Sequence, residues 1–358
     1  MLTPCFWPEV RRGTERMVHE VSTQLLARGE QPTVITSHPG RRVGPITVEG
    51  VPVLRVPRPP TGRFERRWIE DHLTHVPLSY GVLRARRFDV AHAWFTTDAL
   101  AAARWKARTG RPAVHSYMGI PDHRGLMWKR KRLEITQRAL AGCDVTVALS
   151  EHAAGQFRRW FGYDAPVIPP PVDVDTFRPG PARTPVPTIV CAAAIGEPRK
   201  RVELLVRALA HVRRERPGTR LLLNRPWDPA TAARVAGAEG VELVDLDDRA
   251  ELARRYAEAW VSALPSFGEA FGLVLAEAMA CGTPAVGSDL GGIPEVIDSD
   301  AVGRRFSGDD ERDVARALVE AIELAEDPAT AVACRARAER LSSAACADAY
   351  QSLYRSLL

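Results

Sequence analysis

Residues 260–289 read WVSALPSFGEAFGLVLAEAMACGTPAVGSD, and this stretch decides the fold. WVSALPS (260–266) predicts a buried strand, LVLAEAMAC (273–281) a helix, and TPAVGSD (283–289) a second strand. This order is typical of a parallel sheet covered by helices. Ligands of such sheets bind beyond the carboxyl ends of the strands, so we expect the loop FGEAFG (267–272) at a binding site.

The same alternation extends over the chain and restarts after a break. Residues 165–187 contain eight prolines, which excludes the middle of a helix or of a central strand. Further strands are expected at 31–37, 88–95, 112–119, 144–150, 188–194, 220–224 and 241–246, and helices at 13–29 and 97–110. The sequence therefore predicts an α/β protein with two Rossmann-like domains in tandem. The expected parts are a first domain at 1–166, a proline-rich linker at 167–187, a second domain at 188–340, and a C-terminal helix at 341–358 that packs back towards the first domain.

The composition supports two globular domains. The chain has 358 residues, 45% hydrophobic and 26% charged, and single cores stop growing near roughly 250–300 residues. No run approaches about 18 apolar residues, and the start MLTPCFWPEVRRG lacks a secretory pattern. Only Met1 to Pro4 are available for a first strand, so either that strand is very short or the true start lies upstream of this Met.

Charge and cysteine content narrow the function classes. The formal net charge of +5 permits anionic partners, but neither aromatic platforms nor a recognition motif indicate a nucleic-acid binder. The six cysteines form no C-x-x-C pair, so neither a disulfide framework nor a zinc site is expected. A cytoplasmic protein fits best.

Two glutamates flank the start of the predicted helix. Glu269 precedes the helix and Glu277 lies inside it, and eight helical residues span about 12 Å. That separation is too large for a shared proton but suits two ends of one long ligand. The free amides of Phe271, Gly272 and Leu273 would hold a phosphate between them. The alternative is that Glu269 caps the helix and Glu277 is a solvated charge.

Two other loops could contact phosphate. CAAAIGEPRKRVELLVRALAHV (191–212) carries Arg199, Lys200 and Arg201 between a strand and an amphipathic helix. Lys200 is one of only four lysines, and a compact cation at a strand end suits a diphosphate; a solvated charge run is the alternative. Near the start, Gly13 precedes a helix and could present its amide to a phosphate or form a simple turn.

These stretches resemble the retaining GT-B glycosyltransferases of family 4, which carry the E-x7-E signature. The resemblance includes FWPEVRRGTERMVHEVSTQLLARG, FDVAHAW, VALSEHAAGQF, PPPVDVDTF, EPRKRVELLVRAL and PSFGEAFGLVLAEAMACGTPAVGSDLGGIPEVI. It implies two Rossmann-like domains that face each other across a cleft. The second domain would bind the nucleotide sugar and the first the acceptor.

The resemblance also implies roles for residues at matching motif positions. Glu277 would bind the ribose hydroxyls, Glu269 the sugar hydroxyls, and Lys200 the departing diphosphate. Backbone contacts to sugar and phosphates would come from Phe271, Gly272, Leu273 and Gly13. The implied activity is a retaining hexosyl transfer to a hydroxyl of a small molecule, lipid or glycan, without a metal or cofactor. The alternative is a non-catalytic nucleotide-sugar-binding or scaffold protein on this fold.

The chain departs from the family pattern at two positions. The position of the usual arginine after the first strand of the second domain is Ala194, so either Arg199 or Arg201 substitutes for it or the diphosphate is held more weakly. The usual histidine near the donor sugar is Met118, with His115 three residues earlier. A thioether at that place suits a sugar that is deoxygenated at C6.

Acceptor contacts are expected on the first-domain loops 38–72 and 118–130. RGLMWKRKRLEITQR (124–138) joins Met127 and Trp128 to four consecutive basic residues. On a helix it would either lie on an anionic membrane, giving peripheral contact at the inner face, or form a solvated face. His92 is expected as a packing residue at a strand end near the cleft.

Overall fold

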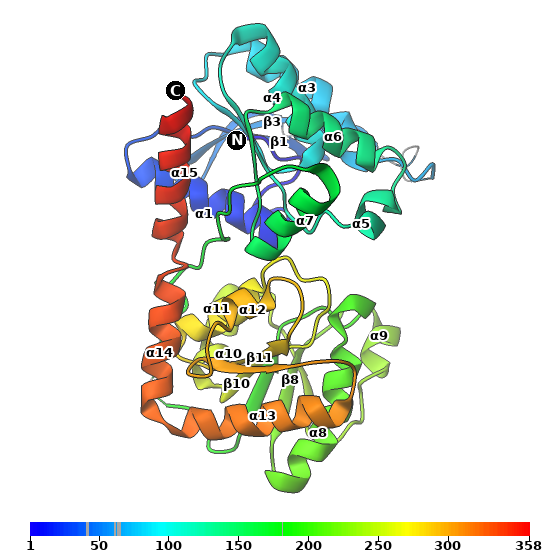
Figure 1. Cartoon of the computed structure of the whole chain (residues 1–358), viewed down its shortest axis with the longest axis vertical. Helices are drawn as coiled ribbons and strands as arrows, with labels where there is room; N and C mark the ends of the chain where they lie inside the picture. Colours follow the sequence, from blue (N-terminus) through cyan, green and yellow to red (C-terminus); the bar gives the residue numbers. More distant parts are fainter. Residues whose placement is uncertain (41–42, 61, 63–65, 181) are drawn as a thin grey trace. The chain divides into compact units, whose positions relative to one another are not determined.

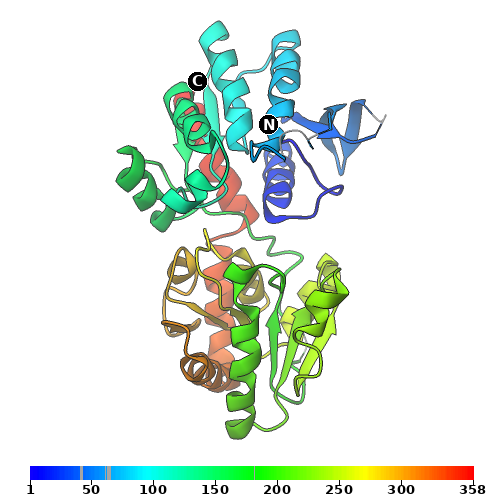
Figure 2. The same cartoon turned by 90° about the vertical axis from the view of Figure 1, so that its right-hand side faces the viewer.

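The structure, a computed structural model, describes residues 1–40, 43–60, 62, 66–180 and 182–358. Expectations for residues 41–42, 61 and 63–65 of the loop 38–72, and for residue 181 of the linker, lie outside this part. The chain divides into two units (Figures 1 and 2). Unit 1 comprises Met1–Pro171 with Ser343–Leu358, and unit 2 comprises Val172–Ser342. The change of unit at Pro171 therefore falls inside the proline-rich segment.

Unit 1 contains two three-stranded sheets, with strand orders β1-β3-β2 and β4-β5-β6. The strands are β1 (Val34–His38), β2 (Gly44–Val48), β3 (Val51–Pro57), β4 (Ala91–Ala93), β5 (Ala113–Ser116) and β6 (Val145–Val147). Leu2 links the two sheets, because it forms parallel bridges to both Ile35 and Ala93. A single residue thus takes the position of the expected first strand.

Helices surround these sheets. They are α1 (Gly13–Ala27), the 3-10 helix η1 (Asp71–Thr74), α3 (His75–Ala85), α4 (Thr96–Thr109), α5 (His123–Trp128), α6 (Arg132–Gly142), α7 (Glu151–Phe161) and α15 (Ser343–Leu357). The last helix, α15, belongs to unit 1 and contacts α1. Arg28 Nε donates to Asp348 Oδ1 at 2.8 Å, and Arg28 NH2 donates to the Ala344 carbonyl at 3.0 Å. These bonds join the two ends of the sequence within one unit.

The loop expected at 38–72 contains a β-hairpin. β2 and β3 pair antiparallel, and β3 also pairs in parallel with β1. The two turn residues, Glu49 and Gly50, have φ values of 46° and 86°. Positive φ at both central residues is the signature of the tightest hairpin turns, which match the twist of the flanking strands. This part of the chain therefore belongs to the sheet.

Unit 2 is built on a six-stranded parallel sheet in the order β12-β11-β10-β7-β8-β9. Its strands are β7 (Thr188–Cys191), β8 (Arg220–Asn224), β9 (Val241–Val244), β10 (Val261–Leu264), β11 (Ala285–Ser288) and β12 (Gly303–Phe306). Its helices are η2 (Pro198–Lys200, 3-10), α8 (Val202–Glu215), α9 (Pro229–Ala233), α10 (Arg249–Glu258), α11 (Leu273–Ala280), α12 (Ile293–Val296), α13 (Glu311–Glu326) and α14 (Pro328–Glu339). β12 was missing from the predicted strands.

The strand order of unit 2 reverses between β7 and β10. From β7 the chain builds outward through β8 to β9, then returns to place β10 on the other side of β7. The loops that leave two such strands diverge to opposite sides and open a crevice at their carboxyl ends. The loops after β7 and β10 are the ones that carry Lys200 and Glu269.

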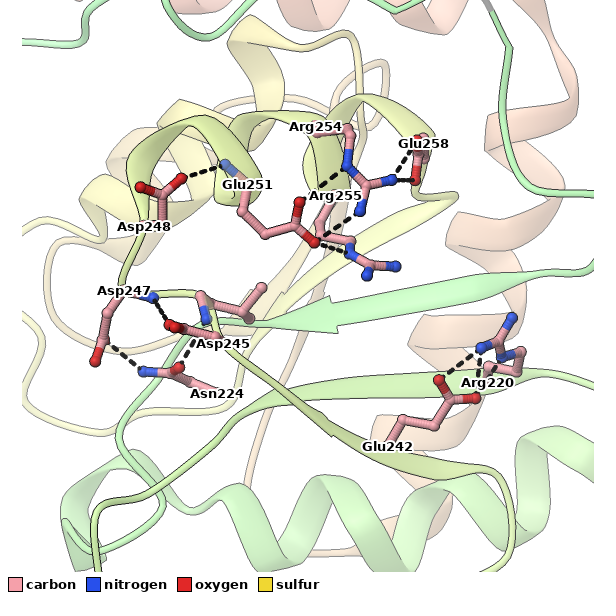
Figure 3. Close-up of polar contacts among 11 residues, drawn as sticks. Arg220, Asn224, Glu242, Asp245, Asp247, Asp248, Glu251, Arg254, Arg255 and Glu258 are labelled. Atoms are coloured by element: carbon pink, nitrogen blue, oxygen red, sulfur yellow. Dashed lines mark hydrogen bonds and ion pairs between the residues drawn. The ribbon is translucent and has the colours of Figure 1, made fainter.

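Polar contacts hold the β8–β9 edge of this sheet (Figure 3). Arg220 binds Glu242 through two hydrogen bonds of 2.6 Å. At the carboxyl ends, Asn224 Nδ2 donates to Asp247 Oδ1 at 3.0 Å. Asp248 begins α10 by accepting from the Glu251 amide at 2.8 Å. Short capping and cross-strand contacts therefore fix where β8, β9 and α10 begin and end.

The basic segment 124–138 does not form the single helix expected. α5 ends at Trp128 and α6 begins at Arg132, with Lys131 in the left-handed conformation (φ 67°) between them. Residues 129–131 are instead held by a bridge from Ile69 to Arg130 and by the Arg130 amide, which donates to the Trp68 carbonyl at 2.7 Å. The four basic residues therefore occupy a turn and the start of α6.

Candidate functional site

The centre of the site in unit 2 is an ion pair between Lys200 and Glu269. The Lys200 Nζ lies 2.6 Å from Glu269 Oε2, and both side chains are mostly buried. Lys200 ends η2 after β7, and Glu269 lies in the loop after β10. The predicted loop residues thus meet at the switch point of the sheet.

Arg199 and Arg201 have different surroundings. Arg199 NH1 lies 3.4 Å from Glu269 Oε2, and its NH2 lies 3.0 Å from Glu197. Arg201 instead donates from Nε to the Pro265 carbonyl at 2.6 Å and from NH1 to the Gly308 carbonyl at 3.1 Å, and it pairs with Asp309. Arg201 therefore joins the loops after β10 and β12, and its substitution for the family's arginine stays a prediction. Arg199 is the cation beside the ion pair.

The loop after β7 is held against the loop after β10 by the backbone. The Phe267 amide donates to the Arg199 carbonyl at 2.9 Å, and the Lys200 amide donates to the Glu197 carbonyl at 2.9 Å. Ala194 lies exposed at the start of this segment, and its carbonyl accepts from the Glu197 amide at 3.2 Å. Backbone bonds therefore set the position of Lys200, while Ala194 contributes no charge.

Two glycines after β11, Gly291 and Gly292, pack against the backbone of Glu269 and Ala270. The sequence analysis assigned them no role. The Gly292 amide donates to the Glu269 carbonyl at 2.8 Å. A Cβ at Gly291 would lie 2.4 Å from the Glu269 carbonyl oxygen, and one at Gly292 would lie 2.3 Å from that of Ala270. Only glycine permits this approach. The pair GG after a predicted strand was the signal that could have identified them.

Helix α11 places the second glutamate in the interior of unit 2. Glu277 is only 2% exposed, so the alternative of a solvated charge is wrong. The helix begins after Gly272, which has φ 102°, and no side chain caps it, so Glu269 is not a capping residue either. Phe271 is buried at 4% exposure beside this start, and Leu273 is the first helical residue. Neither glutamate is therefore an ordinary surface charge, because Glu269 is paired with Lys200 and Glu277 is buried.

Unit 1 has its own pocket at the carboxyl ends of β4 and β5. The cavity has a volume of about 490 Å³, and Met118 and Phe95 are among its lining residues. Gly13, the first residue of α1, follows the lining residue Arg12. Met118 therefore lines this cavity, and its contact with the donor sugar stays a prediction.

The histidines of β4 and β5, His92 and His115, do not line this pocket. His115 is fully buried, with Nδ1 3.3 Å from Thr146 Oγ1, and burial lowers its pKa to about 3. His92 stacks on Trp94 and hydrogen-bonds through Nε2 to Ser116 Oγ at 2.8 Å and through Nδ1 to the Tyr354 hydroxyl at 2.6 Å. Burial lowers the pKa of His92 well below its usual range. Both are neutral core residues.

Comparison with known proteins identifies the family. The model of Glycosyltransferase Family 4 matches residues 11–176, and that of Glycosyl transferases group 1 matches residues 186–324. The D-inositol 3-phosphate glycosyltransferase of Xylanimonas cellulosilytica is 31% identical over 350 residues, covering 83% of this chain and 80% of that protein. The protein of the same name from Segniliparus rotundus is 30% identical over 319 residues, covering 80% and 71%.

Solved structures share the fold. Sucrose-phosphate synthase from Thermosynechococcus elongatus matches with a TM-score of 0.79 at 21% identity, covering 97% of this chain and 94% of that chain. Anabaena HepE in complex with UDP-glucose matches with a TM-score of 0.75 at 17% identity, covering 99% and 98%. The predicted α/β class with a GT-B fold is confirmed, whereas the roles of individual site residues stay predictions. The chain belongs to the family 4 glycosyltransferases.

Proposed function

We propose that the chain is a retaining glycosyltransferase that moves a hexosyl group from a nucleotide-diphosphate sugar to a hydroxyl of an acceptor, without a metal. The observation that carries the proposal is the Lys200–Glu269 ion pair at the crevice of unit 2. With Arg199 beside it and the start of α11 nearby, this place can take both a diphosphate and sugar hydroxyls.

In the proposed reaction the bond between the anomeric carbon and the diphosphate oxygen breaks, and the diphosphate leaves with the electron pair. The acceptor oxygen bonds to the same face of the carbon, and its proton passes to a departing phosphate oxygen. Charge develops on the diphosphate, so fixed amides and a cation there lower the barrier most. Lys200 and the amides of Gly272 and Leu273 are the proposed groups.

Donor binding would exchange the partners of Lys200 and Glu269. In the ion pair the two side chains neutralise each other across 2.6 Å. A bound diphosphate competes with Glu269 for the ammonium and frees its carboxylate to accept hydrogen bonds from the sugar. We propose that buried Glu277 accepts from the ribose, and that the Gly13 amide and Met118 contact the phosphate and the sugar edge.

Lys200→Ala and Glu269→Gln test the proposal. A thermal-shift panel of UDP, GDP, ADP and their sugars first selects the donor, since a ligand of the folded state raises stability. Release of nucleoside diphosphate from that donor should then fall about 100-fold or more in each variant, as for loss of one stabilising group of a transition state. Lys106→Ala is the matched control, because Lys106 pairs with Asp144 at 2.8 Å in unit 1.

Three further results bear on the details. An unchanged rate in both variants would refute the assigned roles. Selective donor binding without any nucleotide release would instead indicate a non-catalytic sugar-binding or scaffold protein. The anomeric configuration of the product, read by NMR, decides between retention and inversion, and a rate that EDTA lowers would contradict metal independence.

We also propose peripheral membrane contact through an exposed apolar cluster in unit 1. Trp68, Met127 and Trp128 are 58%, 59% and 64% exposed, and the two indole rings meet edge to face at 5.8 Å. The exposed Arg130 and Lys131 follow after Lys129. Tryptophan beside cations is the composition that favours an anionic bilayer surface.

A further inference from the structure

A buried carboxylate lies in the unit 1 pocket between two cations. Glu70 is 9% exposed; it accepts a hydrogen bond from Arg132 Nε, and Lys129 Nζ lies 3.8 Å from its Oε2. The bridge from Ile69 to Arg130 places the two segments side by side. Glu70, Lys129 and Arg132 all line the cavity of about 490 Å³.

Arg132 already uses two of its donors within the protein. Arg132 donates from Nε to Glu70 and from NH1 to the Gly125 carbonyl at 3.1 Å. A guanidinium recognises phosphate through two parallel N–H bonds, and here one edge is taken by the protein's own carboxylate. An incoming phosphate would therefore have to displace Glu70 or approach it as a like charge.

The cavity around the cluster has a mixed lining, in which polar residues and the further cation Arg12 stand beside aromatic side chains. Tyr117 and Phe95 line the same cavity. Burial raises the pKa of Tyr117 to about 12, with Arg132 opposing and Glu70 reinforcing the rise, so charges are felt strongly here. Such a cavity penalises a further charge that finds no partner.

We propose that Glu70 is a specificity-determining residue that selects an uncharged polyhydroxylated acceptor by occupying the place of an acceptor anion. The inference rests on the proposed function and names the substrate class of its acceptor site. Each Glu70 oxygen has two lone pairs, so it can accept bonds from acceptor hydroxyls while it stays paired with Arg132. The aromatic side chains of Phe95 and Tyr117, which line the cavity, suit the apolar faces of a cyclic polyol. The chain would then differ from its relatives named for D-inositol 3-phosphate.

The test uses two probes that differ by one phosphate, myo-inositol and D-inositol 3-phosphate, with inorganic phosphate as a third. Binding to the whole chain is measured by calorimetry for the wild type, Glu70→Gln and Glu70→Asp. Glu70→Gln should bind inositol phosphate and inorganic phosphate at least tenfold more tightly than the wild type, with an affinity that falls as salt rises. Glu70→Asp keeps the charge and should keep the exclusion.

Glu134→Gln is the matched control, because Glu134 pairs with Arg138 at 2.6 Å on the exposed face of α6. Tight phosphate binding by the wild type that weakens in Glu70→Gln would show that Glu70 organises an anion site, and would overturn the proposal. So would equal affinities in all variants, or a gain in Glu70→Asp as large as in Glu70→Gln. Nucleotide release from the donor is measured separately; its absence would refute the proposed reaction, while the binding result still decides the role of Glu70.

Discussion

Glu277 could be a solvated charge on sequence grounds alone, but the structure buries it. It occupies the inner face of an otherwise apolar helix and is 2% exposed. A carboxylate offers only acceptors of hydrogen bonds, and the proposed role of Glu277 is to accept them from the ribose hydroxyls.

We predict that Glu277→Gln raises KM for the nucleotide sugar about tenfold or more, because a charged acceptor of hydrogen bonds is worth roughly 1.5–3 kcal/mol. The substitution keeps the side-chain volume, so the fold should survive. Steady-state kinetics against donor concentration measures the effect, and Glu326→Gln, at an exposed position of α13, is the control. A KM equal to that of the wild type would argue against ribose binding.

At this scale the sequence identified the loop residues but not their orientation. Lys200 and Glu269 follow strands that are far apart in sequence, and only the strand order makes β7 and β10 neighbours. The sequence does not distinguish the surroundings of the three consecutive basic residues 199–201. The left-handed conformation of Arg201 (φ 51°) turns it towards the Pro265 carbonyl, while Arg199 stays beside Glu269. Local patterns do not encode such rotations.

At the scale of elements, several strands of unit 2 were predicted close to their observed bounds. β8 was predicted at its observed residues, and β9 and β10 to within two residues. The β2–β3 hairpin was missed because its turn uses Glu49 in place of a usual turn residue. The break between α5 and α6 was missed because bonds to the distant Trp68 segment create it.

Because of this break, the proposed membrane contact involves exposed tryptophans and a basic turn in place of one amphipathic helix. We predict that the protein co-sediments with vesicles that contain anionic lipid, and that a Trp68→Ala, Trp128→Ala double variant loses most of this binding. Apolar insertion and charge attraction act together at such surfaces, so binding should weaken at high salt. Trp160→Ala is the control, since Trp160 is 41% exposed on α7. Equal sedimentation with neutral vesicles, or none at all, would contradict this prediction.

At the scale of the whole molecule, the buried histidines make stability depend on pH. The pKa of His115 is about 3 in the folded state and near 6.5 when unfolded. Below pH 6.5 His115 binds a proton in the unfolded chain but stays neutral in the folded chain. The stability therefore falls as the pH drops from 6.5 towards 3, and it is unaffected by this group above 6.5.

We predict that the free energy of unfolding falls between pH 7 and pH 5 by roughly 2 kcal/mol more in the wild type than in His115→Gln, as one proton per chain requires. Urea titrations at both pH values measure this difference, which cancels any pH-independent cost of the substitution. His123→Gln, at an exposed position, should keep the wild-type dependence. A His115→Gln curve parallel to that of the wild type would show that His115 can be protonated in the folded state.

The return of α15 to unit 1 has a consequence for the order in which the chain is completed during synthesis. The buried His92 and Ser116 bind the hydroxyls of Tyr354 and Tyr350, which lie 262 and 234 residues later in the chain. All of Val172–Ser342 is translated in between. At 5–20 residues per second this takes roughly 10–30 s. The second unit is therefore fully synthesised before α15 can reach unit 1, and a ribosome that stops before residue 343 leaves unit 1 without this helix.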